Sequence, residues 1–388
     1  MAFRRAARLD RLPPYLFIEI DRKKRAALAA GKDVIDLGVG DPDRPTCDFV
    51  IEEMARAIRD PRNHRYPHDA GYPEFKSTVA EWFAHRFGVR LDPQSEVLTL
   101  IGSKEGLGHL PLAVLNPGDA ALIPRPGYPV YESSTIFAGG EPVTMPLRES
   151  SGWLPDFDVI PAATLDRTRL MFLNYPNNPI GATATLDAFG RAVALAKRHD
   201  FLIVHDAAYS EVYYEQPPSS ILQVPGAIDV AVEMYSLSKS FHMTGWRLGF
   251  AVGNAEVLAA LAKIKGNVDS GAFNAIQQAG TAAMRRIDGP ETAEMRAMYR
   301  RRRDEFVSGL RAAGFRVTPP AGAFYIWAPC PAGYDSMGAA ARMLEEASVV
   351  SVPGSGFGAE GEGYVRFSLT SPDERLRAAV ERLGRMRW

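Results

Sequence analysis

Residues Ser236 to Phe250, SLSKSFHMTGWRLGF, place one lysine between two serines and an arginine eight residues after it. The run before the lysine, AVEMYSLS, is apolar and typical of a strand. Lys239 is therefore predicted at the carboxyl end of a strand, where open α/β sheets bind their ligands. A lysine in a cationic, partly desolvated site loses proton affinity, and its free amine can form a Schiff base with an aldehyde. The alternative is an ordinary surface lysine, and the neighbouring hydroxyls and Arg247 argue against it.

The composition is that of a protein acting on small molecules. The 388 residues, 46% hydrophobic and 23% charged, suffice for one large and one smaller domain. A net charge of −1 with mixed signs predicts no binding to nucleic acid or membrane. Cys47 and Cys330, the only cysteines, are far apart, which indicates a reducing compartment. The N-terminus has no apolar signal region and no run of about 18 apolar residues occurs, so we expect a cytoplasmic enzyme.

Apolar runs that end in polar loops alternate with amphipathic stretches, which favours an α/β fold with a mostly parallel sheet between helices. The predicted strands of this part are VLTLIGS, AALIPRP, LMFLNYPNNP, FLIVHDAAYS and VAVEMYSLSK. A long helix from about Pro290 to Ala313 is expected to lead into a smaller α+β domain with strands FRVTPP, AFYIWAP, VVSVPG and GYVRFSLT. We predict an N-terminal arm with part of the small domain (1–45), a large ligand-binding domain (46–285) and a C-terminal small domain (286–388).

The turn GSKEG at 102–106 lies between a predicted strand and a predicted helix. Backbone amides around Ser103 and Lys104 would then face the positive end of a helix dipole, which favours an anion. A structural helix cap is the alternative. Ser236, Ser238 and Arg247 add hydroxyls and a guanidinium, which with these amides would complete a phosphate cup. No metal site is predicted.

Other polar groups follow the remaining strands. Asp206 ends the apolar run FLIVHD, where a buried carboxylate needs a partner such as a protonated pyridine nitrogen. Tyr209 and Asn178 are candidate donors to a phenolate oxygen, and Tyr128 offers a flat face for stacking. Arg366 ends the run YVRF and can bind a substrate carboxylate at two points. Capping, core packing and solvent exposure are the structural alternatives for these residues.

Six motifs in order carry a resemblance that covers essentially the whole chain: GSKEG, PGYPVY, NYPNNPIG, HDAAYSE, SLSKSFHMTGWR and VRFSL. With these motifs the chain resembles the class I/II aminotransferases of fold type I. The resemblance implies pyridoxal 5′-phosphate (PLP) as cofactor, and an amino acid and a 2-oxo acid as substrates. It also implies a large domain whose mostly parallel sheet is sandwiched by helices, plus a smaller α+β domain.

The resemblance implies a role for each matching position. Lys239 would form the Schiff base and move the proton, and Asp206 would face the pyridine nitrogen. Tyr209 and Asn178 would bind the ring oxygen, and Tyr128 would stack on the ring. The phosphate would be held by Ser103, Lys104, Ser236, Ser238 and Arg247, and the substrate α-carboxylate by Arg366 and Gly40. Tyr66 would reach the phosphate of a neighbouring subunit, which implies a homodimer with shared active sites.

Within the family the chain is most similar to the LL-diaminopimelate aminotransferases, through PPYLFIEIDRKK, LGVGDPDRPT, GSKEGLGHLPLAVLNPGD, NVDSGAFNAIQQAG and PGSGFG. This likeness implies LL-2,6-diaminopimelate as donor and 2-oxoglutarate as acceptor. It also implies that Tyr15, Lys104 and Asn274 hold the long substrate. Asp69, in HDAG, stands where some members have a longer glutamate facing the distal ammonium and others a tyrosine, so its contact with the substrate stays open.

Other functions remain open at this point. The donor can be aspartate, alanine, an aromatic or a basic amino acid, and the same cofactor also serves lyases, decarboxylases and oxidases. A ligand-sensing domain of a transcription regulator would need a DNA-binding module, which the first 40 residues do not show. The glycines at 354–358 lack the βαβ context of a dinucleotide site.

Overall fold

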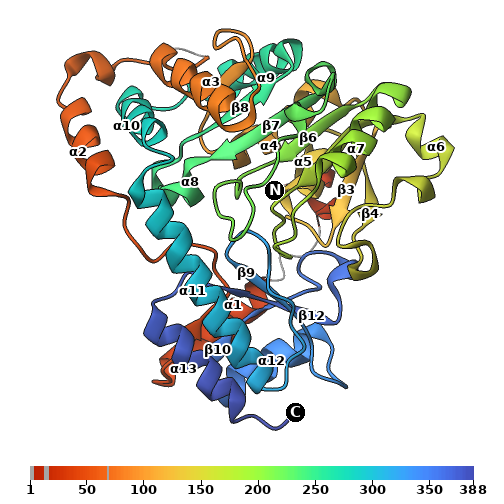
Figure 1. Cartoon of the computed structure of the whole chain (residues 1–388). Coiled ribbons are helices and arrows are strands. Elements are labelled where there is room, and N and C mark those ends of the chain that lie inside the picture. The colour runs from red at the N-terminus through yellow and green to blue at the C-terminus, as the bar shows by residue number, and fades with distance from the viewer. Residues whose placement is uncertain (1–3, 13–16, 68–69) are drawn as a thin grey trace.

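The computed structural model describes residues 4–12, 17–67 and 70–388. Figure 1 shows a large sheet with its helices above a smaller group of short strands and helices. The long helix α11 (Pro290–Ala312) runs between the two, at the position predicted for the connecting helix.

Seven strands form the large sheet in the order β2-β8-β7-β6-β5-β3-β4. Only β8 is antiparallel to its neighbours β2 and β7, while β3 to β7 pair in parallel, which confirms the predicted mostly parallel sheet. β4 and β8 were not among the predicted strands. The strands are β2 (Val97–Leu100), β3 (Ala120–Arg125), β4 (Glu141–Pro146), β5 (Thr168–Asn174), β6 (Leu202–Asp206), β7 (Ala231–Ser236) and β8 (Gly249–Gly253).

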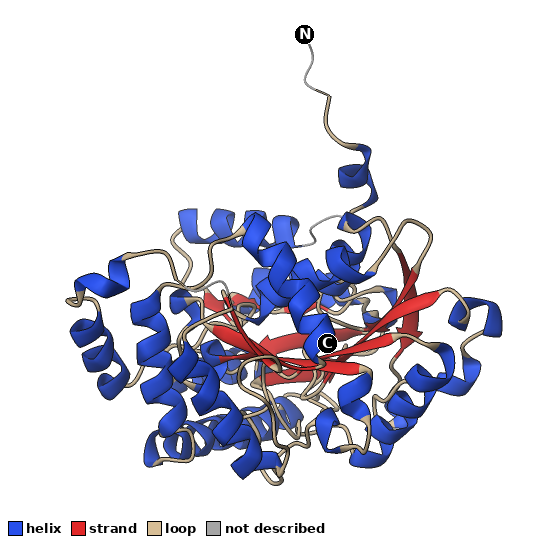
Figure 2. Cartoon of the chain, turned by 90° about the horizontal axis from the view of Figure 1, so that it is seen from above, coloured by secondary structure: helices blue, strands red, loops and turns tan. Residues whose placement is uncertain are grey.

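Helices cover both faces of this sheet, as Figure 2 shows from above. The face that includes Phe172, Val204 and Met234 packs against α4 (Ser103–Val114), α5 (Val130–Phe137) and α9 (Ala255–Val268). The opposite face packs against α3 (Pro73–Phe87), α7 (Leu186–His199) and α10 (Asn274–Arg285). Because successive strand residues point to opposite faces, near-continuous apolar strands supply both cores. Three further helices of this part are α2 (Asp48–Ala57), α6 (Ala162–Leu165) and α8 (Leu237–Ser240).

Local signals fix the ends of several of these helices. The Thr185 hydroxyl accepts from the Ala188 amide at the start of α7, and the Asn254 side chain accepts from the Val257 amide at the start of α9. Gly88 ends α3 in a left-handed conformation, with φ at 69°, which costs a glycine little. These caps bound the helices on which the sheet packs.

The smaller group contains two short sheets. β9 (Tyr325–Pro329), β11 (Val352–Pro353) and β12 (Tyr364–Ser368) form one, and β1 (Ile35–Asp36) pairs with β10 (Val349–Val350) in the other. Three more helices accompany them: α1 (Phe17–Ala29), α12 (Ser336–Ala347) and α13 (Asp373–Gly384). The predicted strand FRVTPP is wrong, because residues 315–320 are irregular and end in two prolines that cannot donate to a ladder. The domain boundaries at 45/46 and 285/286 stay predictions.

Within the described ranges, no helix is both long enough and apolar enough to cross a membrane. Cys47 and Cys330 are both free thiols.

Candidate active site

A cavity of about 630 Å³ opens at the carboxyl ends of the parallel strands. Its lining joins segments from along most of the chain, including Gly38–Gly40, the start of α4, the ends of β6 and β7, and β12. Twelve predicted site residues line it: Gly40, Ser103, Lys104, Tyr128, Asn178, Asp206, Tyr209, Ser236, Ser238, Lys239, Arg247 and Arg366.

Lys239 lies in the short helix α8, directly after β7. Its Nζ donates to the carbonyl oxygen of Gly40 at 3.0 Å and lies 5.5 Å from the ring centre of Phe324 and 5.9 Å from that of Tyr209. Burial lowers the pKa of Lys239 to about 8, and the positive charges of Arg247 and Arg366 act in the same direction. A substantial fraction of this amine is therefore neutral near physiological pH, as a nucleophile requires.

The pH dependence of cofactor attachment follows from this pKa. Below about pH 8 the Lys239 amine is mostly protonated and cannot attack, and above it the amine is free. The rate at which cofactor-free protein gains visible absorption with PLP should therefore rise with pH and level off above about pH 8. For an ordinary lysine the same rise would be centred near about pH 10.4. Stopped-flow absorbance measures it, with free lysine as reference. A midpoint near 10 would contradict the assignment.

Asp206 is the last residue of β6 and is only 4% exposed. Its Oδ2 accepts from the Tyr131 hydroxyl at 2.8 Å, and its Oδ1 accepts from the Ala208 amide at 3.2 Å. Burial raises the pKa of Asp206, and these hydrogen bonds oppose that shift. Sequence reasoning missed Tyr131; the only signal was its place three residues after Tyr128 in PGYPVY. Tyr131 thus fixes the orientation of the Asp206 carboxylate, which forms no ion pair within the described part of the chain.

The anion end of the cavity is built around Gly102, whose φ of 75° suits a glycine. A Cβ atom at Gly102 would lie 2.5 Å from Arg247 Nη2, so the missing side chain lets the guanidinium approach the turn. The next residue, Ser103, begins α4, where no side chain caps the helix and the first amides lack intrahelical partners. Arg247 and these amides are therefore suited to bind a phosphate group.

Arg366, which is buried in β12, adds another positive charge to the lining of the cavity. Its guanidinium donates to Asn178 Oδ1 at 2.9 Å and to the Gly38 carbonyl at 2.6 Å, and lies over the rings of Tyr325 and Phe357. Its Nε is buried with no hydrogen-bond partner among the described residues. A buried donor without a partner is costly, so Arg366 is suited to receive a carboxylate.

Tyr325 is a second residue that sequence reasoning missed, since a tyrosine in an apolar strand is typical of a core. Its hydroxyl is 2.9 Å from that of Tyr209, and a side chain at Gly40 would overlap it. Near the mouth, the exposed Lys104 places its Nζ 5.7 Å from the ring centre of Tyr128. Aromatic rings therefore flank the space between the anion site and Arg366.

Two predicted residues do not line this cavity. Tyr66 is 86% exposed, and Asn274 is buried at the start of α10, where its Oδ1 has no partner in the described part of the chain. Tyr15 and Asp69 lie outside the described residues.

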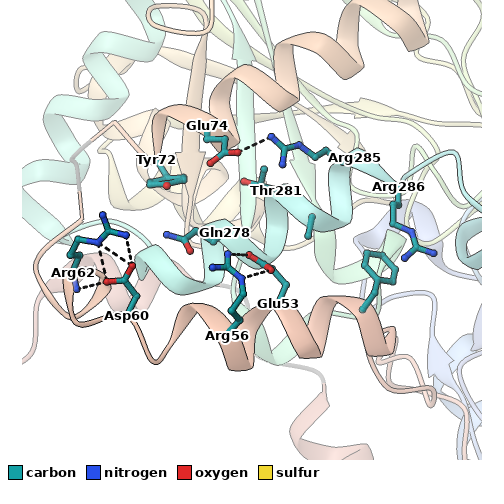
Figure 3. A pocket seen from close by; sticks show the side chains of 12 residues that line it. Glu53, Arg56, Asp60, Arg62, Tyr72, Glu74, Gln278, Thr281, Arg285 and Arg286 are labelled. Carbon is teal, nitrogen blue, oxygen red and sulfur yellow. Dashed lines mark hydrogen bonds and ion pairs between the residues drawn. The ribbon is translucent and has the colours of Figure 1, made fainter.

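A second cavity of about 640 Å³ lies between α2, α3 and α10, and Figure 3 shows its side chains. Each of its four arginines pairs with a carboxylate: Arg56 with Glu53, Arg62 with Asp60, Arg285 with Glu74 and Arg286 with Glu291. Gln278, which lines it, lies one helical turn after Asn274 on α10. This cavity has no free cation for an anionic ligand within its lining.

Comparison with known proteins gives consistent matches. Residues 32–383 match the family described as aminotransferase class I and II. The LL-diaminopimelate aminotransferase of Syntrophobacter fumaroxidans is 54% identical over 387 residues, covering 100% of both chains. Among solved structures, substrate-bound BacF from Bacillus subtilis has 38% identity and a TM-score of 0.95 over 99% of this chain and 98% of that one. A probable N-succinyldiaminopimelate aminotransferase from Thermus thermophilus has 36% identity and a TM-score of 0.90 over 95% and 99%.

Proposed function

The chain belongs to the class I and II aminotransferases, which use pyridoxal phosphate, and we propose that it transfers the amino group of LL-2,6-diaminopimelate to 2-oxoglutarate. The observation that carries the choice of donor is the 54% identity, over the full length of both chains, to an LL-diaminopimelate aminotransferase. The cavity around Lys239 supports the chemistry.

The residues of the cavity fit PLP. One lysine with a lowered pKa is available for the aldehyde, and the buried carboxylate of Asp206, whose charge is made costly by burial, forms no ion pair among the described residues. The turn at Gly102 with Arg247 suits a phosphate, and the Arg366 Nε suits a carboxylate. When bound, the cofactor supplies an electron sink that makes the α-proton of an amino acid acidic.

Each residue then has a part in the reaction. The free Lys239 amine would take the α-proton at its Nζ and then donate it to the C4′ carbon of the cofactor. Asp206 would accept a hydrogen bond from the protonated ring nitrogen and keep that nitrogen charged. Tyr209 and Asn178 bind the ring oxygen, Tyr128 stacks on the ring, and Arg366 with Gly40 binds the α-carboxylate. The phosphate is held by Ser103, Lys104, Ser236, Ser238 and Arg247.

A diaminopimelate has a second amino-acid end, which needs its own partners. Lys104 lines the cavity and is exposed. We propose that its ammonium attracts the distal carboxylate of the substrate as well as the phosphate of the cofactor. Tyr15, Asp69 and Asn274 complete the proposed set for the distal end. Because Asp69 is shorter than glutamate, we propose that it acts on the distal ammonium through water.

A donor screen tests this function. The purified protein loaded with PLP is given 2-oxoglutarate and one donor at a time, and glutamate is measured. The donors are LL-diaminopimelate, its N-succinyl derivative, aspartate, alanine, arginine and aromatic amino acids. LL-diaminopimelate should give the highest kcat/KM. Preference for the N-succinyl derivative would favour the activity named for the Thermus protein, and preference for an aromatic or simple aliphatic donor would rule the diaminopimelate assignment out.

Replacing Arg366 with lysine should raise KM strongly for every α-amino acid. A lysine is a point charge, whereas the guanidinium offers paired donors that match a carboxylate. Loss of a charge-assisted hydrogen bond of about 1.5–3 kcal/mol corresponds to a KM increase of roughly 10- to 100-fold. Steady-state kinetics with two different donors measure it, and Arg300→Lys on α11, away from the cavity, is the matched control. An unchanged KM in R366K would remove Arg366 from the site.

The proposal includes a homodimer with shared active sites. Tyr66, proposed to reach a neighbouring phosphate, is 86% exposed and outside the cavity of its own chain, and Asn274 likewise lies outside it. Asn274 lies one helical turn before Gln278, which lines the second cavity, and we propose that this side of α10 meets the partner subunit.

Mixed subunits test the dimer. Lys239→Ala and Tyr66→Ala should each be inactive or weak alone. After the two variants are unfolded together and refolded, mixed dimers contain one site with both native side chains, so activity should reappear. Light scattering measures the assembly. A monomer, or no recovery of activity in confirmed mixed dimers, would contradict shared sites.

The proposed compartment is the cytoplasm. Both cysteines are free thiols, as expected for a protein of a reducing compartment.

A further inference from the structure

A buried histidine and glutamate lie beneath the cavity, outside the set assigned above. His205 on β6 and Glu233 on β7 are both fully buried, and strand pairing places them opposite each other. His205 directly precedes Asp206. Because successive strand residues point to opposite faces, the imidazole lies on the α7 side of the sheet, where it contacts the ring of Phe189.

Both ring nitrogens of His205 face oxygen acceptors. Nδ1 is 2.6 Å from Glu233 Oε1, and Nε2 is 3.0 Å from the backbone carbonyl oxygen of Tyr175. A carbonyl oxygen can only accept, so Nε2 carries a proton. If Glu233 is ionised, Nδ1 must carry one too, and the ring is an imidazolium.

The surroundings of Glu233 favour the ionised form. Besides His205, its two oxygens accept from the Ile221 amide at 3.0 Å, from the Tyr235 hydroxyl at 3.2 Å and from the Ser220 hydroxyl. Ser220 Oγ itself accepts from the Leu222 amide, which directs its proton to Glu233. Hydrogen bonds donated to a carboxylate favour its charged form, so the shared proton belongs on His205.

The imidazolium is connected to the cavity in two ways. Burial raises the pKa of Asp206, the hydrogen bonds from Tyr131 and Ala208 oppose that shift, and the positive charge of His205, one residue away, acts in the same direction as these bonds. Its Nε2 also holds the carbonyl of Tyr175, at the base of the loop that carries Asn178. The only other titratable groups that contact this imidazole or Glu233 among the described residues are the Tyr235 hydroxyl and, through the chain, Asp206.

We propose that His205, kept doubly protonated by Glu233, is a positioning residue of the transamination, which holds Asp206 in its charged form opposite the cofactor's ring nitrogen. This inference rests on the proposed role of Asp206. It assigns the buried pair a function in the reaction rather than in stability alone.

The first test needs no variant. In protein labelled with ¹⁵N-histidine, both ring nitrogens of His205 should give signals of protonated nitrogen, because both face oxygen acceptors. A His205 signal from an unprotonated nitrogen at pH 7 would overturn the proposal.

The second test uses Glu233→Gln with Tyr235→Phe as its control. Glutamine removes the negative charge that favours the second proton on His205, whereas Tyr235→Phe removes one donor and leaves the carboxylate. Protein loaded with PLP labelled with ¹⁵N in the ring should show a protonated ring nitrogen in the parent and in Y235F. In E233Q this signal should move to the unprotonated position.

The outcomes separate the two proposals. If PLP does not attach to the parent protein, the proposed function fails. If PLP attaches and its ring nitrogen stays protonated in E233Q while His205 has become neutral, only the role of His205 fails. Should E233Q not fold, the ¹⁵N-histidine measurement on the parent decides alone.

Discussion

Replacing Lys239 with alanine is expected to abolish measurable transamination and the visible absorption of the lysine-bound cofactor. The variant lacks the Lys239 amine, which lines the cavity and whose pKa is lowered by burial. It loses both covalent attachment and the group that moves the α-proton. A positioned acid or base alone contributes about 10²- to 10⁴-fold, so kcat should fall by at least that factor.

Lys263→Ala is the matched control, because Lys263 is exposed on α9 and does not line the cavity. It should keep the activity and the absorption of the parent. Phosphate contacts do not require Lys239, so K239A should still bind PLP without covalent attachment, measurable by fluorescence titration. Normal turnover of K239A would contradict the assignment of the amine.

Replacing Asp206 with asparagine should give the second largest loss. The amide has nearly the same shape but no charge, so a protonated ring nitrogen loses its partner. An opposite charge at close range shifts a pKa by about 1–3 units, and its removal would reduce the protonated fraction by roughly 10- to 1,000-fold. We expect kcat to fall within that range, with a much smaller change in KM.

Tyr131→Phe provides a graded comparison for Asp206. It removes the hydrogen bond to Asp206 Oδ2 and leaves the charge, so its kcat should lie between those of the parent and of D206N. The pH profile of kcat, measured for all three proteins, separates loss of charge from loss of orientation. Equal kcat values for D206N and the parent would contradict the role of Asp206.

The large sheet could be predicted because its central strands are apolar runs followed by polar loops. β4 and β8 were missed for identifiable reasons. β4, EPVTMP, is an edge strand with two prolines, and β8, GFAVG, begins and ends with glycine, both of which weaken the sequence signal of a strand. FRVTPP has the alternation of a strand, but its prolines and the lack of a neighbouring strand leave it irregular.

The cavity residues could be predicted where a polar residue ends or closely follows an apolar run. Lys239, Asp206 and Arg366 all do so, and the structure brings them together. Tyr131 and Tyr325 could not be found in this way, because a tyrosine in an apolar helix or strand has the same pattern as a core residue. Their roles depend on hydrogen bonds between segments far apart in the chain.

The positions of Tyr66 and Asn274 show a different limit. Neither lines the cavity of its own chain, so their proposed roles depend on the proposed partner subunit and cannot be read from a pattern within one chain. The His205–Glu233 pair is a third case, since it is recognisable only once two strands are in register.

The most direct test of this account is the half-reaction with LL-diaminopimelate. The PLP-loaded protein is mixed with this donor in the absence of any 2-oxo acid, and absorbance is followed by stopped flow. We predict that the visible band disappears within a single turnover and returns when 2-oxoglutarate is added, with glutamate released. A band that LL-diaminopimelate leaves unchanged, or that alanine or an aromatic amino acid removes faster, would contradict the account.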